Sequence, residues 1–244
     1  MHVILTRPED DNASMRAALE ARGITVSLAP MMSIAFKPVE PSIFDGISGV
    51  VVTSRNALKA IGHEGLAGRI ADLPVFTVGP ATAAHAKTMG FRDVIEGPGT
   101  AANLTSVIAQ HPAAKGLLLH LAGNRQAFDL SGALATLGVA LRQVEVYTRV
   151  AAQTLPEAVA RTLADGSADA VILMSPETAR AWKAALQRLP VKPDLTKVVH
   201  LALSAAVAQT LGPDRSLKIE IASSPNAEQM LALTFDLAAK SAAE

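Results

Sequence analysis

The 244-residue chain contains no cysteine and few aromatic residues. The absence of cysteine excludes disulfide bonds, thiolate nucleophiles and thiolate metal ligands, and it is compatible with a reducing compartment. Aromatic residues make up only 3% of the chain, with one tyrosine and one tryptophan. As the only tyrosine of the chain, Tyr147 is therefore a residue of interest.

An excess of charge of either sign is also absent, since 22 basic residues balance 22 acidic residues. A binding site for nucleic acid or for an anionic membrane surface normally needs clustered basic residues, so we expect neither partner. No apolar run is long enough to cross a bilayer, and the residues after Met1 do not resemble a signal peptide. These features favour a cytoplasmic protein that acts on a small molecule.

The residues that are present predict an α/β fold. Half of the chain is hydrophobic, and short β-branched runs alternate with alanine-rich segments of helical period, such as residues 8–22. Runs that are apolar throughout are typical of parallel strands covered by helices on both faces. The predicted strands span residues 3–6, 25–28, 49–53, 75–78, 94–96, 117–121, 170–174, 198–203 and 217–221.

Two extended stretches, residues 31–39 and 139–150, interrupt this alternation. We expect them to pair as a two-stranded linker between two flavodoxin/Rossmann-like parallel-sheet domains. The first domain is then discontinuous, with residues 1–32 and 151–244, and the second is an inserted domain of residues 36–147.

An approximate repeat accompanies this division. Residues 52–57 resemble residues 173–178, with Ser54 and Ser175 separated by 121 positions, and Gly90 and Gly212 are separated by 122. The spacing fits an internal duplication, although alanine-rich segments also align by chance.

The residues that could bind a ligand or take part in a reaction lie at the ends of the predicted strands. In doubly wound sheets, ligands bind at the carboxyl ends of the strands, where helix N-termini present free N–H groups. Each hydroxyl there has the alternative role of capping a helix, whereas an arginine between a strand and a helix is suited to a bidentate contact with a carboxylate. The turns thus favour an anionic ligand. The candidate binding residues are Arg7, Thr53, Ser54, Arg55, Gly79, Thr82, Arg125, Ser175 and Ser204.

The sequence contains no phosphate-binding loop, dinucleotide fingerprint, zinc-protease motif or serine-hydrolase elbow. We therefore expect no cofactor and no metal. The six histidines lack the spacing of metal ligands and are interpreted as core or surface residues. Tyr147 lies on the predicted linker, and both a packing role and a catalytic role remain open for it.

Several of these segments resemble the uroporphyrinogen-III synthase family in order and spacing. The resemblance covers the turn at residues 5–8, the T-S-x-N-A segment at 52–57, the V-G-x-x-T-A turn at 77–83, the G-x-R turn at 123–125 and the strand at 146–149. The second half departs from the pattern: Met174 replaces a threonine before Ser175, and Ser204 alone keeps a hydroxyl in its turn.

The resemblance implies a cyclising lyase of tetrapyrrole biosynthesis that acts as a monomer without a cofactor. Its substrate would be hydroxymethylbilane, which carries an acetate and a propionate on each ring. Loss of the hydroxyl group as water would leave an electrophilic azafulvene, which the substituted carbon of ring D attacks before the ring recloses in inverted orientation. Tyr147 would assist the departing hydroxyl, and Thr53, Ser54, Gly79 and Thr82 would contact carboxylates.

Two alternatives remain open at this level. One is a non-catalytic, two-lobed module that binds a small anion, and the other is an inactive homologue, suggested by the altered second half.

Overall fold

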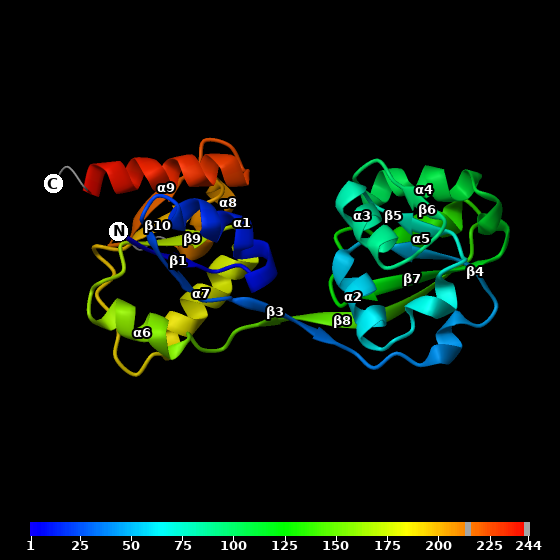
Figure 1. The fold of residues 1–244 in the computed structure, drawn as a ribbon, viewed down its shortest axis with the longest axis horizontal. Helices are drawn as coiled ribbons and strands as arrows, with labels where there is room; N and C mark the ends of the chain where they lie inside the picture. The colour runs from blue at the N-terminus through cyan, green and yellow to red at the C-terminus, as the bar shows by residue number, and fades with distance from the viewer. Residues whose placement is uncertain (213–215, 242–244) are drawn as a thin grey trace. The chain divides into compact units, whose positions relative to one another are not determined.

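The computed structural model describes residues 1–212 and 216–241. The chain forms two compact units (Figure 1), of which unit 1 comprises Met1–Ser33 with Val150–Glu244 and unit 2 comprises Ile34–Arg149. Each unit is built on a largely parallel sheet covered by helices on both faces, so the predicted α/β class with two parallel-sheet domains and a two-stranded linker is confirmed.

Unit 1 has a five-stranded, wholly parallel sheet of order β11-β10-β9-β1-β2. Helices α7 and α8 cover one face around Trp182, while α1 and α9 cover the other around Leu5 and Met230. Its strands are β1 (His2–Leu5), β2 (Thr25–Leu28), β9 (Ala170–Leu173), β10 (Val199–Ala202) and β11 (Lys218–Ile221). Its helices are α1 (Glu9–Glu20), α6 (Glu157–Ala164), α7 (Pro176–Arg188), α8 (Ala205–Leu211) and α9 (Ala227–Ser241).

Unit 2 has a six-stranded sheet of order β3-β8-β7-β4-β5-β6, in which the five strands from β8 to β6 are parallel. Helices α2 and α3 pack on one face, and α4 and α5 pack on the other. The strands are β3 (Met32–Phe36), β4 (Ile47–Val52), β5 (Val75–Thr77), β6 (Val94–Glu96), β7 (Leu117–Gly123) and β8 (Leu141–Ala151). The α-helices are α2 (Arg55–His63), α3 (Pro80–Thr88), α4 (Ala101–Gln110) and α5 (Leu130–Thr136), and the 3-10 helices are η1 (Pro41–Phe44), η2 (Ala67–Ile70) and η3 (Pro112–Lys115).

Strands β3 and β8 carry the chain between the units as neighbouring strands. The backbone N–H of Ala152 donates to the carbonyl of Met31, and that of Lys37 donates to the carbonyl of Val146. Because the residue number falls on one strand as it rises on the other, the two strands run antiparallel. The pairing matches the predicted linker.

The two sheets have the same spatial order with a different chain connectivity. Strands β8-β7-β4-β5-β6 of unit 2 correspond to β2-β1-β9-β10-β11 of unit 1. The offset of 121 residues aligns Ser54, the N-cap of α2, with Ser175, the N-cap of α7. The 122-residue offset aligns Gly90 and Gly212, which follow α3 and α8 and both have positive φ angles. The repeat seen in the sequence therefore marks equivalent turns.

Candidate active site

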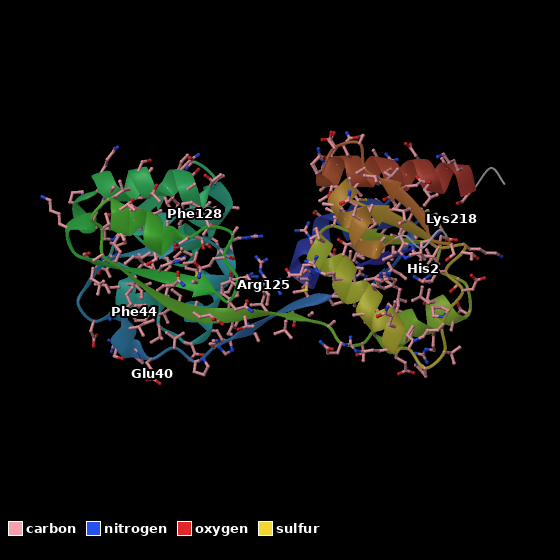
Figure 2. All side chains as sticks on the ribbon, turned by 180° about the vertical axis from the view of Figure 1, so that it is seen from behind. His2, Glu40, Phe44, Arg125, Phe128 and Lys218 are labelled. Atoms are coloured by element: carbon pink, nitrogen blue, oxygen red, sulfur yellow. The ribbon has the colours of Figure 1, made fainter. Side chains whose placement is uncertain are left out.

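The candidate site of unit 2 lies at the carboxyl ends of β4 and β7. The two strands are neighbours, yet the chain continues from β4 into α2 on one face of the sheet and from β7 into α5 on the opposite face. Doubly wound sheets bind ligands at such a switch point. Thr53, Ser54 and Arg55 follow β4, while Arg125 follows β7 and projects from its turn in Figure 2.

Two helix N-termini in unit 2 differ in how they are capped. The Ser54 side chain accepts a hydrogen bond from the backbone N–H of Asn56, which is the predicted capping role. Its own hydroxyl hydrogen stays available for an outside acceptor. Gly79 caps α3 without a side chain, and Thr82, which is 9% exposed, lies in the first turn of that helix. The α3 N-terminus is therefore open to an anionic group.

Two basic side chains of α2 lie close to His85, which is in the last turn of α3. Burial is the largest cause of the lowered pKa of His85 on α3, followed by the nearby positive charges of Lys59 and Arg55 on α2. The Nε2 atom of His85 is buried and has no hydrogen-bond partner among the described residues. Arg55 and Lys59 thus bring two positive charges close together, which favours the binding of an anion beside them.

Tyr147 lies on β8 at the carboxyl edge of the same sheet. The register between β7 and β8 shifts from Ala122↔Glu145 to Gly123↔Tyr147, so β8 has an extra residue here. Such a bulge redirects the side chains that follow it. The Tyr147 ring consequently lies directly on Gly123, where an added Cβ atom would stand 2.5 Å from the ring carbon Cζ.

The ring of Tyr147 is packed in the core, while its hydroxyl group is left for other interactions. The residue is only 4% exposed and belongs to the core beneath α2 and α3, whereas none of the residues that the structure describes forms a hydrogen bond with its hydroxyl group. The backbone carbonyl of Tyr147 accepts a hydrogen bond from Asn124, whose side chain accepts one from Arg149. Tyr147 is thus fixed against the turn after β7.

A chain of polar side chains crosses the opposite face of the unit 2 sheet. The Thr53 hydroxyl lies 3.3 Å from Nε2 of His120, and Nδ1 of His120 lies 3.1 Å from Oε1 of Gln143. His120 is 1% exposed. Burial lowers its pKa, and the hydrogen bond with Gln143 opposes this shift, so the ring is neutral at pH 7.

The corresponding turns of unit 1 hold the other predicted residues. Arg7 follows β1, and its carbonyl accepts a hydrogen bond from the side chain of Asn12. Ser175 caps α7 by accepting from the N–H of Thr178, and its hydroxyl also lies 2.8 Å from that of Thr178. Ser204 occupies the N-cap position of α8 but forms no side-chain cap.

The structure therefore gathers the predicted residues into two sets, one at the carboxyl edge of each sheet. Thr53, Ser54, Arg55, Gly79, Thr82, Arg125 and Tyr147 belong to unit 2, whereas Arg7, Ser175 and Ser204 belong to unit 1. The sequence interpretation overlooked His85, His120 and Gln143. One available signal was a histidine within the otherwise apolar strand that begins at Leu117.

A cavity with a volume of about 520 Å³ lies elsewhere, in unit 1. Trp182, Leu186, His200 and Leu217 line it near the start of β10, at the sheet edge opposite to the candidate turns. Across residues 1–212 and 216–241, no three histidine, aspartate or glutamate side chains are grouped as a metal site. No described helix is long and apolar enough to span a bilayer.

Comparisons with known proteins identify the relatives of this chain. The model of the family described as uroporphyrinogen-III synthase HemD matches residues 13–232, while the curated proteins contain no match. A solved uroporphyrinogen-III synthetase from Helicobacter pylori is similar with a TM-score of 0.65 at 15% identity, covering 97% of this chain and 99% of that one. A mutant uroporphyrinogen III synthase from Thermus thermophilus has a TM-score of 0.54 at 18% identity, covering 99% of both chains. These structures share the fold, and the match over residues 13–232 shows that the chain belongs to the uroporphyrinogen-III synthase family, the cyclising lyases of tetrapyrrole biosynthesis.

Proposed function

We propose that this protein converts hydroxymethylbilane into uroporphyrinogen III by the reaction that the family resemblance implies, with loss of water and inversion of ring D. The observation that carries the proposal is the family match over residues 13–232. The positive charges of Arg55 and Lys59 on α2 support it, because the substrate is a polycarboxylate.

The binding role of each turn follows from its chemistry. Arg55 provides positive charge, the Thr82 hydroxyl provides an O–H donor, and the N-terminus of α3 provides a partial positive charge for carboxylates. Ser54 adds a hydroxyl donor, and Gly79 permits close approach because it has no side chain. Arg125 would contact a further carboxylate from the turn after β7, while Arg7, Ser175 and Ser204 would contribute from unit 1.

Tyr147 is the proposed catalytic residue. Its hydroxyl has no protein partner among the described residues, while the contact with Gly123 holds its ring. A hydrogen bond or proton from this phenol would help the substrate hydroxyl to leave as water. The azafulvene formed in this way is then attacked by the substituted carbon of ring D.

Control of conformation is the larger task for the enzyme. Hydroxymethylbilane also closes without inversion, so the protein must favour the folded conformer in which the substituted carbon of ring D attacks the azafulvene. This attack gives a spiro intermediate, which fragments and recloses with ring D inverted. Fixed carboxylate contacts suit this task because they hold the four rings in relation to Tyr147. We further propose that the enzyme acts as a cytoplasmic monomer, which sedimentation of the purified protein and fractionation of cells would test.

An isomer assay tests the proposal directly. The protein is incubated with hydroxymethylbilane, the products are oxidised, and the type I and type III isomers are separated. Type III product is expected, and type I product alone would refute the activity. The binding-module alternative predicts ligand binding without turnover, whereas an inactive homologue gives only the spontaneous isomer.

A further inference from the structure

His120 connects the candidate site to the linker strand through two hydrogen bonds. Its Nε2 atom faces the hydroxyl of Thr53 after β4, and its Nδ1 atom faces Oε1 of Gln143 on β8. His120 itself lies on β7 between these strands and is paired with Val51 and Gln143 in the two registers. The three side chains therefore form a continuous chain across the sheet that ends at the switch point.

The direction of these hydrogen bonds follows from the atoms involved. An amide oxygen only accepts, so the hydrogen of the neutral imidazole lies on Nδ1 and is donated to Gln143. Nε2 then carries a lone pair and accepts the hydroxyl hydrogen of Thr53. The Thr53 oxygen keeps its own lone pairs, and this half-buried side chain can only accept from a ligand.

The equivalent positions of unit 1 show that the fold does not need this polar chain. The β1–β9 register aligns Leu5 with Ile172, and the β1–β2 register aligns Leu5 with Leu28. By the same alignment Leu5 corresponds to His120, Leu28 to Gln143 and Met174 to Thr53. All three counterparts are apolar and pack in one core cluster. A buried polar set where the related sheet uses apolar residues indicates a role other than stability.

We propose that His120, held by Gln143, is a positioning residue that makes the Thr53 hydroxyl an acceptor for a pyrrole N–H group of the bound tetrapyrrole. The inference rests on the proposed function for the identity of the ligand. A linear tetrapyrrole offers carboxylate acceptors and pyrrole N–H donors, and only the donors match Thr53 in this arrangement. This assignment differs from the expectation that Thr53 contacts a carboxylate.

The first test measures the tautomer without using activity. In protein labelled with ¹⁵N-histidine at pH 7, the expected His120 signals are those of a protonated Nδ1 and a bare Nε2, assigned by their loss in His120→Leu. Thr53→Val should shift the Nε2 resonance because it removes the donor. A ring protonated on Nε2, or on both nitrogens, would overturn the proposal whether or not the protein makes type III product.

The second test is a double-mutant cycle on the type III reaction. Thr53→Val should raise KM about five-fold, the effect of one neutral hydrogen bond, whereas Thr53→Ser keeps the hydroxyl and should stay within about two-fold of wild type. His120→Leu should raise KM about three-fold in the wild-type background and have no further effect in Thr53→Val. The same increase in both backgrounds, or in neither, would overturn the coupling.

Two controls separate positioning from general damage. His200→Leu removes another buried histidine, which lies on β10 of unit 1 outside the site, and it should leave KM unchanged. The combined variant Thr53→Met, His120→Leu and Gln143→Leu installs the residues of unit 1 and should fold while showing the KM of Thr53→Val. A wild-type protein that makes no type III product would instead refute the proposed function.

Discussion

Units 1 and 2 have the same strand order but differ in the side chains at their carboxyl edges. At the equivalent turns, unit 2 has Thr53 and Gly79 where unit 1 has Met174 and Ser204. Unit 2 also has the positive charges of Arg55 and Lys59 on α2, close to α3, whereas α8 begins with two alanines after Ser204. The same architecture therefore carries Thr53 and two basic side chains in unit 2, where the equivalent turns of unit 1 have Met174 and the alanines that begin α8.

This difference indicates a division of labour. Side-chain recognition of the carboxylates and the catalytic phenol belong to unit 2 in the proposed function, whereas unit 1 contributes mainly backbone N–H groups and shape. The following variants are designed to break or sharpen that contrast.

The largest effect is expected for Tyr147→Phe. The substitution keeps the ring against Gly123 and removes only the hydroxyl, so kcat for type III product should fall by about 100-fold, the lower range of general acid catalysis. The measurement is steady-state formation of separated isomers. A melting temperature close to that of wild type would exclude unfolding as the cause, and an undiminished kcat would show that Tyr147 has no part in the chemistry.

Gly123→Ala should damage the same step through geometry. The added Cβ would lie within 2.7 Å of three atoms of Tyr147 and must displace the ring. We expect a fall in kcat approaching that of Tyr147→Phe, and a loss of about 1–3 kcal/mol in the free energy of unfolding, as for other overpacked cores. Gly68→Ala is the control, because its Cβ would meet no atom within 4 Å. If Gly123→Ala keeps both activity and stability, the close packing is not required.

Neutralising Lys59 tests the positive charges on α2 with a matched position in unit 1. Lys59→Met should raise KM about five-fold, within the range for loss of a charge-assisted contact, and the increase should shrink at high salt as screening weakens the wild-type attraction. Arg180 lies at the equivalent position of α7, and Arg180→Met should change KM by less than about two-fold on a surface without such a contact. Equal effects at the two positions would remove the electrostatic distinction between the units.

The smallest expected effect is the change of the free energy of unfolding with pH, and it should be similar in both units. Burial lowers the pKa of His120 in unit 2 and of His200 in unit 1. Below the ordinary histidine pKa of about 6.5, these histidines bind protons in the unfolded chain but stay neutral in the native state. The free energy of unfolding therefore falls as pH falls. Each histidine contributes at most about 1.4 kcal/mol per pH unit to this slope.

Denaturant titrations between about pH 7.5 and 5, a range that brackets the ordinary histidine pKa, measure that slope. His120→Leu and His200→Leu should each make the decline shallower, since each removes one group that is neutral in the native state. A decline with the wild-type slope in both variants would show that these rings do not control acid stability.

The sequence was informative about the fold because its signals are local. Continuous apolar runs such as residues 170–174 predict buried parallel strands, and β9 is observed over Ala170–Leu173. The linker was also visible, since residues 139–150 alternate in a way that a fully buried strand does not, and β8 spans Leu141–Ala151. The family prediction is confirmed by the match over residues 13–232.

The candidate site was predictable only in part. The turn residues could be identified because the end of a strand is a local feature, and Ser54 and Ser175 indeed occupy the predicted cap positions. Contacts between distant residues were not accessible, since Thr53 meets His120 across 67 positions. The contact of Tyr147 with Gly123 depends on a bulge in β8, which no local sequence pattern predicts.

The most direct test of the division between the units compares two double variants in the type III assay. Arg55→Ala with Thr82→Ala removes side-chain contacts from unit 2, and Ser175→Ala with Ser204→Ala removes the hydroxyls from unit 1. We predict that KM rises more than about ten-fold in the first variant and less than about three-fold in the second. An equal or larger rise in the unit 1 variant would contradict the division.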